Sequence, residues 1–577
     1  MKNKKKLSLF TLLSFTYILF SCTSTTTTTS AHTGDAKGDG NASTLTVIEE
    51  PNNEGEFTLT TEDGSFTQEG NIYTITKAGT YLATGKLEQG QILVQASEEE
   101  EVELQLSNAT ITNNSDSPIK AESADKLKVK AVKDTSNLIQ DNRSKKTVDD
   151  DTVGEAAIYA SCDLTLNGQG TLIVQGNYNN GVQSSDDLTL KNQYLQIEAY
   201  NNALKGNDSV TIEEGGNFKL ISTAGDGIKT ENSDISSKGN QKGNVNISAG
   251  TIDITANNDG IDAAYNIYVY QEGDIQPNIY IASGNYSAPT SKSGQGGWDH
   301  STSSSESYKG MKADNEITIQ AGVIDILSQE DALHANYGTT LENNEKGLGN
   351  VTIEGGTINI QAGDDGIHAD NTIALKGGTL NIDMAYEGLE ANFIDISGGY
   401  NTIYAVDDGV NASKKINQTP KITITGGRLD VTVSSGDTDG IDSNGSYVQT
   451  GGVVIARAPG NSGNMNMGAI DADSGVSIQG GTLLIVGAYG NITASSSVLT
   501  KTWGSSSMQG GGGGRPFATN NSSISLPKGD ISVNLDITVD FYLASTASQF
   551  AIYTSNAQKN VTYSVTSGST TVTSFTF

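Results

Sequence analysis

Apolar and polar residues alternate with a period of two through most of this chain, in short runs separated by glycine-containing bends. Segments such as "VNISAGTIDITA" (245–256), "VTIEGGTINIQA" (351–362) and "ITITGGRLDVTV" (422–433) each hold two such runs around one bend. This alternation predicts β-strands with one buried face and one solvent face. Helical periodicity is nearly absent, so we expect an all-β protein.

A second short unit lies between these paired strands. It consists of a small residue, an apolar residue, a polar residue and another small residue, as in "GIDA" (260–263), "GIHA" (366–369) and "GLEA" (388–391). Copies run from "PIKA" (118–121) to "AIDA" (469–472), and the closest are 21–24 residues apart. A repeat of this length with three short strands predicts a single-stranded parallel β-helix, or solenoid, of about 13 or more coils. Irregular caps and polar loop insertions are expected around it.

Stacked coils bury together an apolar face that no single coil can bury. The apolar residues of the units would form one inward ladder and the following small residues the next: Ile261, Ile367, Leu389, Val410 and Ile441, then Ala263, Ala369, Ala391 and Ala412. The polar residue between them would point outward.

The remaining segments differ in composition, and they set the predicted boundaries. Strand-rich segments without the unit flank the helix and would cap it. The predicted order is an export signal at 1–21, a flexible tether at 22–45, capping coils at 46–116, the β-helix at 117–495, a Gly/Ser-rich loop at 496–522 and a C-terminal β cap or appendage at 523–577.

The first residues predict export from the cell. "MKNKKKLSLFTLLSFTYILFSC" has a basic start, an apolar run and a small residue before Cys22. "LFSC" resembles a bacterial lipobox, which would make the protein a cell-surface or outer-membrane lipoprotein attached through Cys22. Phe20 is bulkier than the usual residue there, so simple cleavage and secretion is the alternative. Cys162 is the only other cysteine, and no disulfide framework is expected.

The formal net charge of the chain is −32. Such a charge argues against nucleic acid and anionic membrane surfaces as partners. It favours divalent cations, which bind between crowded carboxylates. An acidic surface that only maintains solubility is the alternative explanation.

Stacking turns the acid that precedes each unit into a column of carboxylates. Like charges would lie about 5 Å apart in successive coils, which is costly without a counter-ion. Ca²⁺ binds six to eight oxygens, and we expect two or more calcium ions. The predicted ligands are Asp226, Asp259, Asp262, Asp365, Asp408, Asp439, Asp442 and Asp471. The alternative is a purely structural ladder in which Asn and Asp side chains hydrogen-bond the turn backbone.

The outward polar positions offer basic groups for a ligand. The candidates are Lys205, Lys229, Lys312, His334 and His368. The two histidines fall in adjacent units of the same column. They either hold zinc between them or lie at the surface and stack on a ligand. Trp298 and Trp503 lie in Gly/Ser-rich segments, where each would stack on a sugar ring or anchor its loop.

The units "DGIDA", "DGIHAD" and "EGLEAN", with the opening "YTITKAGTYLATGKL", resemble a bacterial family of secreted carbohydrate-binding β-helix proteins that bind cellulose and polygalacturonate. The resemblance covers roughly residues 70–495. It implies a right-handed parallel β-helix, bound calcium and affinity for an acidic plant cell-wall polysaccharide. We expect a monomer with a lipid anchor as its only membrane contact.

That family is in turn similar to calcium-dependent pectate lyases, so a polysaccharide lyase is the second hypothesis. The lyase calcium cluster is matched loosely by Asp226, Asp259 and Asp262 and by Asp408, Asp439 and Asp442. Lys312, one unit beyond the first cluster, is the weak candidate for the base that removes the proton. A polygalacturonase is disfavoured because the chain contains no Gly-His-Gly. A surface adhesin or structural β-helix without a glycan ligand is the third hypothesis.

Overall fold

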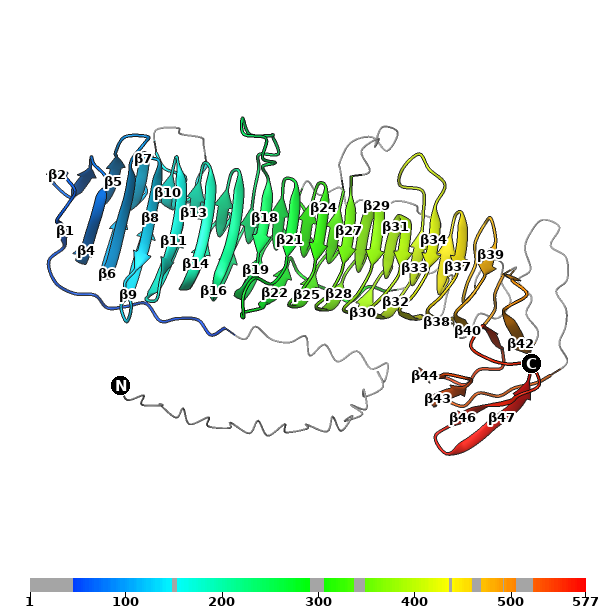
Figure 1. The fold of residues 1–577 in the computed structure, drawn as a ribbon. Helices are drawn as coiled ribbons and strands as arrows, with labels where there is room; N and C mark the ends of the chain where they lie inside the picture. Colours follow the sequence, from blue (N-terminus) through cyan, green and yellow to red (C-terminus); the bar gives the residue numbers. More distant parts are fainter. Residues whose placement is uncertain are drawn as a thin grey trace, which may run out of the picture. The chain divides into compact units, whose positions relative to one another are not determined.

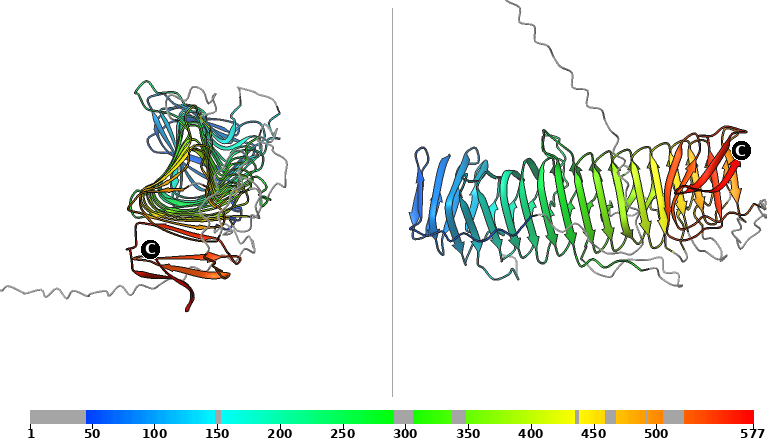
Figure 2. Two further views of the ribbon diagram at one scale, coloured as in Figure 1. Left: turned by 90° about the vertical axis from the view of Figure 1, so that its right-hand side faces the viewer. Right: turned by 90° about the horizontal axis from the view of Figure 1, so that it is seen from below.

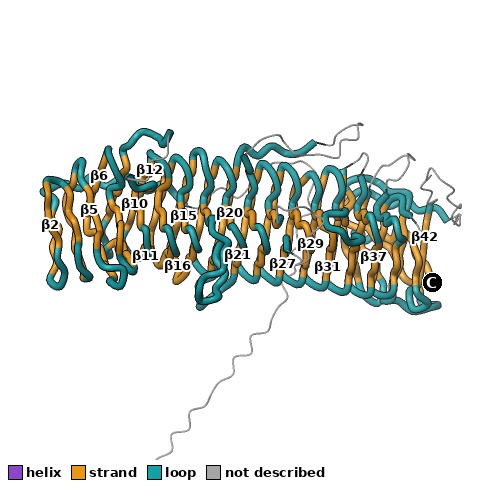
Figure 3. Tube along the Cα trace, turned by 90° about the horizontal axis from the view of Figure 1, so that it is seen from above, coloured by secondary structure: helices purple, strands orange, loops and turns teal. Residues whose placement is uncertain are grey.

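The computed structural model describes most of the chain, and all described residues belong to one compact unit, Lys37–Phe577. The described ranges are 45–147, 153–290, 306–336, 348–434, 438–458, 468–490, 492–504 and 522–577. The predicted export signal, nearly all of the tether with Cys22, and Trp298 lie outside them. The described residues form β-strands throughout, as predicted (Figures 1 and 3). These ranges contain no helix with the length and apolarity that a membrane crossing requires.

Most strands belong to one 43-stranded sheet, and most of these pair in parallel with their counterparts one repeat before and one repeat after. We call one repeat a coil and the three resulting sets of strands columns A, B and C, in the order in which the chain enters them. Figure 1 shows the successive coils side by side, and Figure 2 shows them superposed along the stack.

Column A contains the repeated units. Its strands are β3 (Ile72–Ile75), β5 (Gln91–Gln95), β7 (Ile119–Ser123), β10 (Ala156–Ala160), β13 (Asn180–Ser184), β15 (Leu204–Gly206), β17 (Ile228–Lys229), β20 (Ile261–Ala263), β23 (Met311–Ala313), β26 (Leu333–Ala335), the first parts of β29 (Ile367–Leu375) and β31 (Leu389–Ile396), β33 (Val410–Ala412) and β36 (Ile441–Ser443).

Column B follows in each coil. It holds the first parts of β4 (Gly79–Leu87), β6 (Glu101–Asn113), β14 (Asp187–Ala199) and β16 (Ser209–Ser222), the second parts of β29 and β31, and β8 (Lys126–Ala131), β11 (Asp163–Gly168), β18 (Asn244–Ile247), β21 (Asn266–Val269), β24 (Glu316–Ile319), β27 (Asn350–Ile353), β34 (Lys421–Ile424), β37 (Ser446–Gln449), β39 (Val476–Ile478) and β41 (Ile492–Ala494).

Column C completes each coil. It holds the second parts of β4, β6, β14 and β16 with β9 (Ser136–Asp141), β12 (Thr171–Gly176), β19 (Gly250–Ala256), β22 (Pro277–Ser283), β25 (Val323–Ser328), β28 (Thr357–Ala362), β30 (Thr379–Ala385), β32 (Tyr400–Ala405), β35 (Arg428–Val433), β38 (Val453–Arg457) and β40 (Thr482–Val486).

The core consists of the two predicted inward ladders and their equivalents in columns B and C. In column A the pairing runs from Ile261 through Met311, Leu333, Ile367, Leu389 and Val410 to Ile441, and each of these side chains is fully buried. The alanine ladder keeps the same register. The prediction of both ladders is confirmed.

The bend between columns B and C requires glycine because adjacent coils approach closely there. Gly378 has a φ of +75°, and a Cβ on it would lie 2.7 Å from the carbonyl carbon of Gly355 in the preceding coil. An L-amino acid with a side chain would be strained by this φ and would clash with that backbone. The Gly-Gly pairs of the sequence therefore mark the B–C corner.

Antiparallel strands close both ends of the large sheet. At the amino end β1 (Thr58–Thr61) pairs with β4, and β2 (Phe66–Glu69) pairs with β3. At the carboxyl end β45 (Phe550–Thr554) pairs with both β40 and β42 (Leu499–Trp503). Such pairing covers strand edges that would otherwise be free to pair with another chain.

A separate four-stranded sheet follows, formed by β43 (Gly529–Asn534), β44 (Thr538–Leu543), β46 (Thr562–Ser567) and β47 (Thr570–Thr576). Its apolar residues cluster with Ile455 and Leu484 of column C and with Trp503. Trp503 is buried and stacks on Phe550 with ring centroids 5.6 Å apart. Of the two roles considered for this residue, Trp503 therefore anchors the C-terminal segment.

Candidate functional site

Long connections adjoin column A. Of the connections that the structure describes in full, those of eight or more residues are 230–243 and 413–420, and both lead from column A to column B. Insertions are tolerated where they serve a binding surface or do not disturb packing. Column A is therefore the face that the sequence elaborates.

The acids that precede the units bind the next coil through one carboxylate oxygen. The backbone N–H of Asp259 donates to Asp226 Oδ1 (3.0 Å) and that of Lys309 to Asp259 Oδ1 (2.6 Å). The same contact joins Asp365 to Asp331 Oδ1 (2.9 Å). The structural explanation of the Asn/Asp column thus accounts for Oδ1. The second oxygen of each of these carboxylates, Oδ2, faces the outward residue three positions later.

The first predicted metal cluster, Asp226, Asp259 and Asp262, does gather, with one oxygen of each within 4.8 Å of the others. Two predicted ligand-binding lysines lie against it. Lys229 Nζ is 2.9 Å from Asp226 Oδ2 and 2.7 Å from Asp262 Oδ2. Lys312 Nζ is 3.3 Å from Asp262 Oδ1 and 3.7 Å from Asp259 Oδ2. Two ammonium groups therefore already neutralise much of this cluster.

The pKa values follow this arrangement. Burial raises the pKa of Asp259 to about 6, although Lys312 acts against the shift. Burial acts to lower the pKa of Lys229, but the carboxylates of Asp262 and Asp226 outweigh it and raise that pKa. Lys312 is affected in the same way by Asp262 and Asp259. Both lysines are charged at neutral pH.

A second cluster occupies the next coils and includes both column histidines. The rings of His334 and His368 stack with centroids 4.8 Å apart and planes inclined by 18°. His334 Nδ1 is 2.6 Å from Asp331 Oδ2. His368 Nδ1 is 3.1 Å from Asp365 Oδ2 and 3.1 Å from Glu390 Oε2. The histidine pair is thus held by carboxylates of three coils.

Burial and neighbouring carboxylates give the two histidines different protonation states. It lowers the pKa of His334 to about 4, so this ring is neutral at pH 7. For His368, hydrogen bonds to Asp365, Asp370 and Glu390 outweigh burial and raise the pKa well above its usual value. The pKa of Asp365 is also well above its usual value, chiefly because the side chain is buried and Glu390 is near.

In the coils beyond this cluster, neighbouring acids raise one another's pKa values. Burial and the charge of Glu390 raise the pKa of Glu387 well above its usual value. Burial and the charge of Asp408 raise the pKa of Asp439 to about 9. The pKa of Asp442 rises to about 6 through burial and the charge of Asp471. The described carboxylates of Asp408, Asp439 and Asp442 do not gather as tightly as the first cluster.

The sequence analysis did not name several residues that belong to these clusters. Glu330, Asp331, Asp364, Glu387 and Glu390 complete the acidic coils, and Lys309 and Lys415 pair with them at 2.7 Å to Glu330 Oε2 and 2.6 Å to Glu390 Oε2. Asp331, Glu387 and Glu390 occupy the same repeat positions as the predicted ligands, so the repeat itself could have identified them. Lys415 comes from a connection, where no repeat guides the prediction. Lys205, which was predicted, pairs with Glu231 at 2.9 Å.

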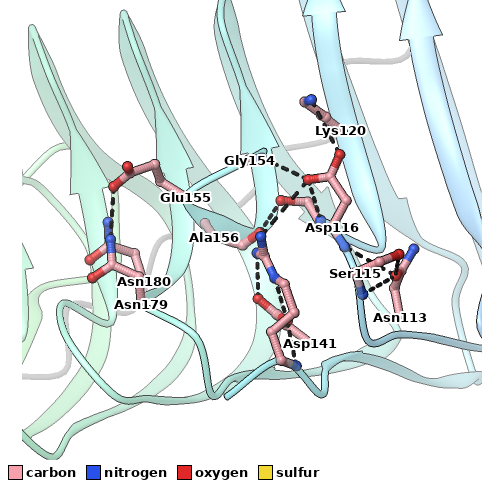
Figure 4. A network of polar contacts seen from close by, with 12 residues as sticks. Asn113, Ser115, Asp116, Lys120, Asp141, Gly154, Glu155, Ala156, Asn179 and Asn180 are labelled. Carbon is pink, nitrogen blue, oxygen red and sulfur yellow. Dashed lines mark hydrogen bonds and ion pairs between the residues drawn. The ribbon is translucent and has the colours of Figure 1, made fainter. Parts of the chain in front are cut away.

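The amino-terminal coils of column A carry a different polar network, shown in Figure 4. The buried Arg143 contacts Asp141 (Nη2–Oδ2, 2.7 Å) and lies over the ring of Tyr178 at 3.9 Å. Asp116 accepts from the backbone N–H of Gly154 (2.7 Å) and pairs with Lys120 at 3.2 Å. These contacts fasten both ends of the 142–155 connection to the stack. Asp141, Arg143 and Gly154 lie outside the repeated unit, so the repeat did not indicate these contacts.

Comparisons with known proteins identify a family whose model covers most of the repeated units. A family model described as "Carbohydrate-binding domain-containing protein" matches residues 69–347 and 341–436. A protein of that description from Acetivibrio thermocellus is 36% identical over 126 residues, which are 22% of this chain and 44% of that protein. The chain thus spans less than half of the length of this relative.

Among solved structures, a polysaccharide lyase-like protein from C. thermocellum, determined as a gadolinium derivative, is similar to part of the chain. The match has 35% sequence identity and a TM-score of 0.35, and it covers 39% of this chain and 86% of that one. The family model, in contrast, extends over more than half of the chain. On that match, this protein belongs to the family of carbohydrate-binding domain-containing proteins.

Proposed function

We propose that this protein binds an acidic polysaccharide along the outward face of column A. The observation that carries the proposal is the register of this face. Lys205, Lys229, Asp262, Lys312, His334, His368 and Glu390 pair in sequence from coil to coil. Their backbones are therefore spaced by about 4.8 Å along one line, and the 230–243 and 413–420 connections adjoin the same column. An extended polymer with repeated carboxylates and hydroxyls suits such a line of charged groups.

We propose a right-handed parallel β-helix of about 13 or more coils as the scaffold. The parallel pairing of each strand with the equivalent strands of neighbouring coils supports this proposal. The glycan would lie along the stack rather than enter a cleft. Polygalacturonate is the first candidate and cellulose the second.

We also propose calcium ions on the acid-rich part of this face, near Asp408, Asp439, Asp442 and Asp471. Burial and mutual repulsion disfavour the ionised forms of Asp439 and Asp442, and a divalent cation would offset this cost. Asp226, Asp259 and Asp262 fit calcium less well because Lys229 and Lys312 already lie against their oxygens. Calcium bound at the acid-rich coils would link glycan carboxylates to the protein.

Lyase chemistry is the weaker candidate. The base that removes the proton next to a uronate carboxylate must itself be unprotonated. The carboxylates of Asp262 and Asp259 hold the pKa of Lys312 above its usual value, against the effect of burial. A protonated Lys312 is suited to binding a uronate carboxylate. Incubation with polygalacturonate and calcium, followed by ultraviolet absorbance, tests this point; unsaturated product that Lys312→Ala abolishes would establish a lyase.

For localisation we propose export, with Cys22 lipidated after cleavage of residues 1–21, which would present a monomeric binding face at the cell surface. Intact-mass measurement of the native protein, before and after ester hydrolysis, tests the lipid directly. A mature chain that starts elsewhere or carries no lipid at Cys22 would contradict the anchor.

The binding experiment is isothermal titration of polygalacturonate, cellulose oligosaccharides and a neutral glucan, each with calcium or with chelator. We expect saturable binding of polygalacturonate that weakens in chelator, and a lower melting temperature after calcium removal. Lys312→Gln should weaken binding. Lys128→Gln is the matched control, since Lys128 is similarly exposed but lies on column B and pairs with Glu101. Equal effects of the two substitutions, or no retention of any glycan, would refute the proposed face and favour an adhesin or structural protein.

A further inference from the structure

We propose that Asp365 Oδ2, His368 Nδ1 and Glu390 Oε2 form a binding site for a zinc-class transition-metal ion. The three groups come from two adjacent coils, with Asp365 just before β29, His368 on β29 and Glu390 on β31. They form one of the clusters whose ligand atoms all lie within 4.8 Å of each other. This site lies on the proposed glycan-binding face but does not depend on glycan binding.

The ligand atoms are already spaced for a small ion. His368 Nδ1 is 3.1 Å from each of the two carboxylate oxygens. A tetrahedral ion with bonds of about 2.0–2.2 Å holds its ligand atoms roughly 3.3 Å apart. Small movements of the two carboxylates, whose oxygens lie within 4.8 Å of each other and of the nitrogen, would convert these contacts into a coordination site. A water molecule or a ligand oxygen would supply the fourth position.

The donor set selects the class of metal. One imidazole nitrogen with two carboxylate oxygens suits zinc, cobalt or nickel, whereas calcium and magnesium bind oxygen. The Asp226–Asp259–Asp262 cluster has no imidazole and is occupied by two lysines. The two clusters of the same column therefore differ in both charge and metal preference.

Asp370 supplies independent support from outside the ligand set. Its Oδ1 lies 3.9 Å from His368 Nε2, the ring nitrogen that faces away from the cluster. Histidines that bind metals usually have a carboxylate, carbonyl or water at the other ring nitrogen, which orients the ring and strengthens its basicity. Asp370 is buried, so it is a fixed partner for this nitrogen. We assign it as a positioning residue.

His334 is not a ligand in this site, although its ring stacks on His368. The lone pair of an imidazole nitrogen lies in the plane of the ring, and the two planes differ by only 18°. Lone pairs of near-parallel stacked rings do not converge on one ion. His334 Nδ1 is also engaged by Asp331 at 2.6 Å. His334 therefore does not form with His368 the zinc pair that its sequence position suggests.

The surroundings favour a dication. Asp331 and Asp364 are further acids beside the site, each with an oxygen within 4.8 Å of one of Asp365. The nearest cation is Lys415, whose Nζ lies 2.6 Å from Glu390 Oε2. A metal ion on this oxygen would displace Lys415, which extends from the 413–420 connection. The His368 and Glu390 side chains keep small exposed fractions, 13% and 14%, so solvent reaches the site.

The experiment uses the full chain freed of transition metals and kept in excess calcium, so that calcium fills the sites whose ligands are all oxygens. Co²⁺ is titrated and followed by visible absorption, and Zn²⁺ is titrated by calorimetry. We expect one equivalent of Co²⁺ with tetrahedral absorption bands that Zn²⁺ abolishes. His368→Gln should remove the bands. Asp370→Asn should weaken Zn²⁺ binding about 10–100-fold and keep them.

His334→Gln and Asp226→Asn are controls that should retain the one-equivalent cobalt spectrum. Circular dichroism and melting curves exclude unfolding of the variants. An unchanged spectrum in His368→Gln, or the absence of bands from the parent protein, would overturn the assignment. The metal titrations contain no glycan, so they remain decisive whether or not polygalacturonate binds.

Discussion

The two halves of column A share one backbone pattern but manage charge differently. In the amino-terminal half each buried acid meets a basic side chain: Asp141 meets Arg143, and Asp226 and Asp262 meet Lys229. From Asp365 onward the acids of this column mainly meet His368 or other acids, although Glu390 also pairs with Lys415. Burial and neighbouring carboxylates raise the pKa values of Glu387 and Asp439. The corner hydrogen bonds to the next coil occur in both halves.

This difference shows that the fold requires the side-chain oxygen of each corner acid and only tolerates its negative charge. The fold requires one side-chain oxygen per corner, which an asparagine supplies equally well, as Asn202 does for the N–H of Asp226 (2.9 Å). The negative charge itself is not needed for stacking. Where it is kept without a matching cation, as at Asp439, it costs stability unless an ion or ligand binds. The carboxyl-terminal half is therefore the better place to look for bound ions.

The largest effect should come from breaking a matched pair in the amino-terminal half. Arg143→Ala would leave the Asp141 carboxylate, whose side chain is fully buried, without its partner. We expect a loss of about 3–5 kcal/mol in the free energy of unfolding, measured from urea denaturation. Lys126→Ala is the control, because its pair with Asp163 is largely exposed and should contribute at most about 1 kcal/mol. Similar losses in both variants would contradict a special role of burial.

A smaller effect is expected from Lys229→Met. The substitution removes the ammonium group between Asp226 and Asp262 but keeps an apolar side chain of similar length. We expect a loss of about 2–3 kcal/mol in metal-free buffer, below the full cost of a deeply buried charge, since both acids retain other partners. Calcium should restore part of the melting temperature in this variant and little in the parent protein. A variant indifferent to calcium would show that the three oxygens cannot form an ion site even when the lysine is gone.

The pH dependence sharpens the comparison in the other half. The pKa of folded Asp439 is about 9, above the usual value near 3.8, so the folded state binds more protons than the unfolded state between these values. Stability must then fall as pH rises through this window, by at most about 1.4 kcal/mol per pH unit for one group.

The measurement is the melting temperature in chelator from pH 5 to 8. Asp439→Asn should flatten the curve and raise it at pH 8, because the uncharged amide keeps an oxygen for the backbone N–H of Gly468. Saturating calcium should have a similar effect in the parent protein. An unchanged slope in the variant would show that Asp439 is already ionised and compensated throughout this range.

The sequence was sufficient for the register of column A but not for its charges. Alternation and the repeated unit placed Ile261 over Met311, and Asp259 beside Asp262 and Asp226, because parallel pairing converts equal spacing into neighbouring positions. The direction of long side chains does not follow from spacing, so the lysines predicted to face a ligand were found against acids. Arg143 and Lys415 lie in connections, where no repeat fixes their position. A β cap or appendage was predicted at 523–577, but not its four-stranded order, and the role of Trp503 was left open between ligand stacking and loop anchoring, since both depend on long-range packing.

The smallest effect should come from Lys205→Gln. Lys205 pairs with Glu231, whose side chain is nearly half exposed, so the pair should contribute at most about 1 kcal/mol to stability. Its effect on polygalacturonate binding is more informative, because Lys205 lies on the outward line two coils before Asp262. If the glycan follows the whole line, affinity should fall severalfold with the melting temperature unchanged. Unchanged affinity, together with a loss in Lys312→Gln, would confine the ligand to the histidine and acid-rich coils, where the metal sites are proposed.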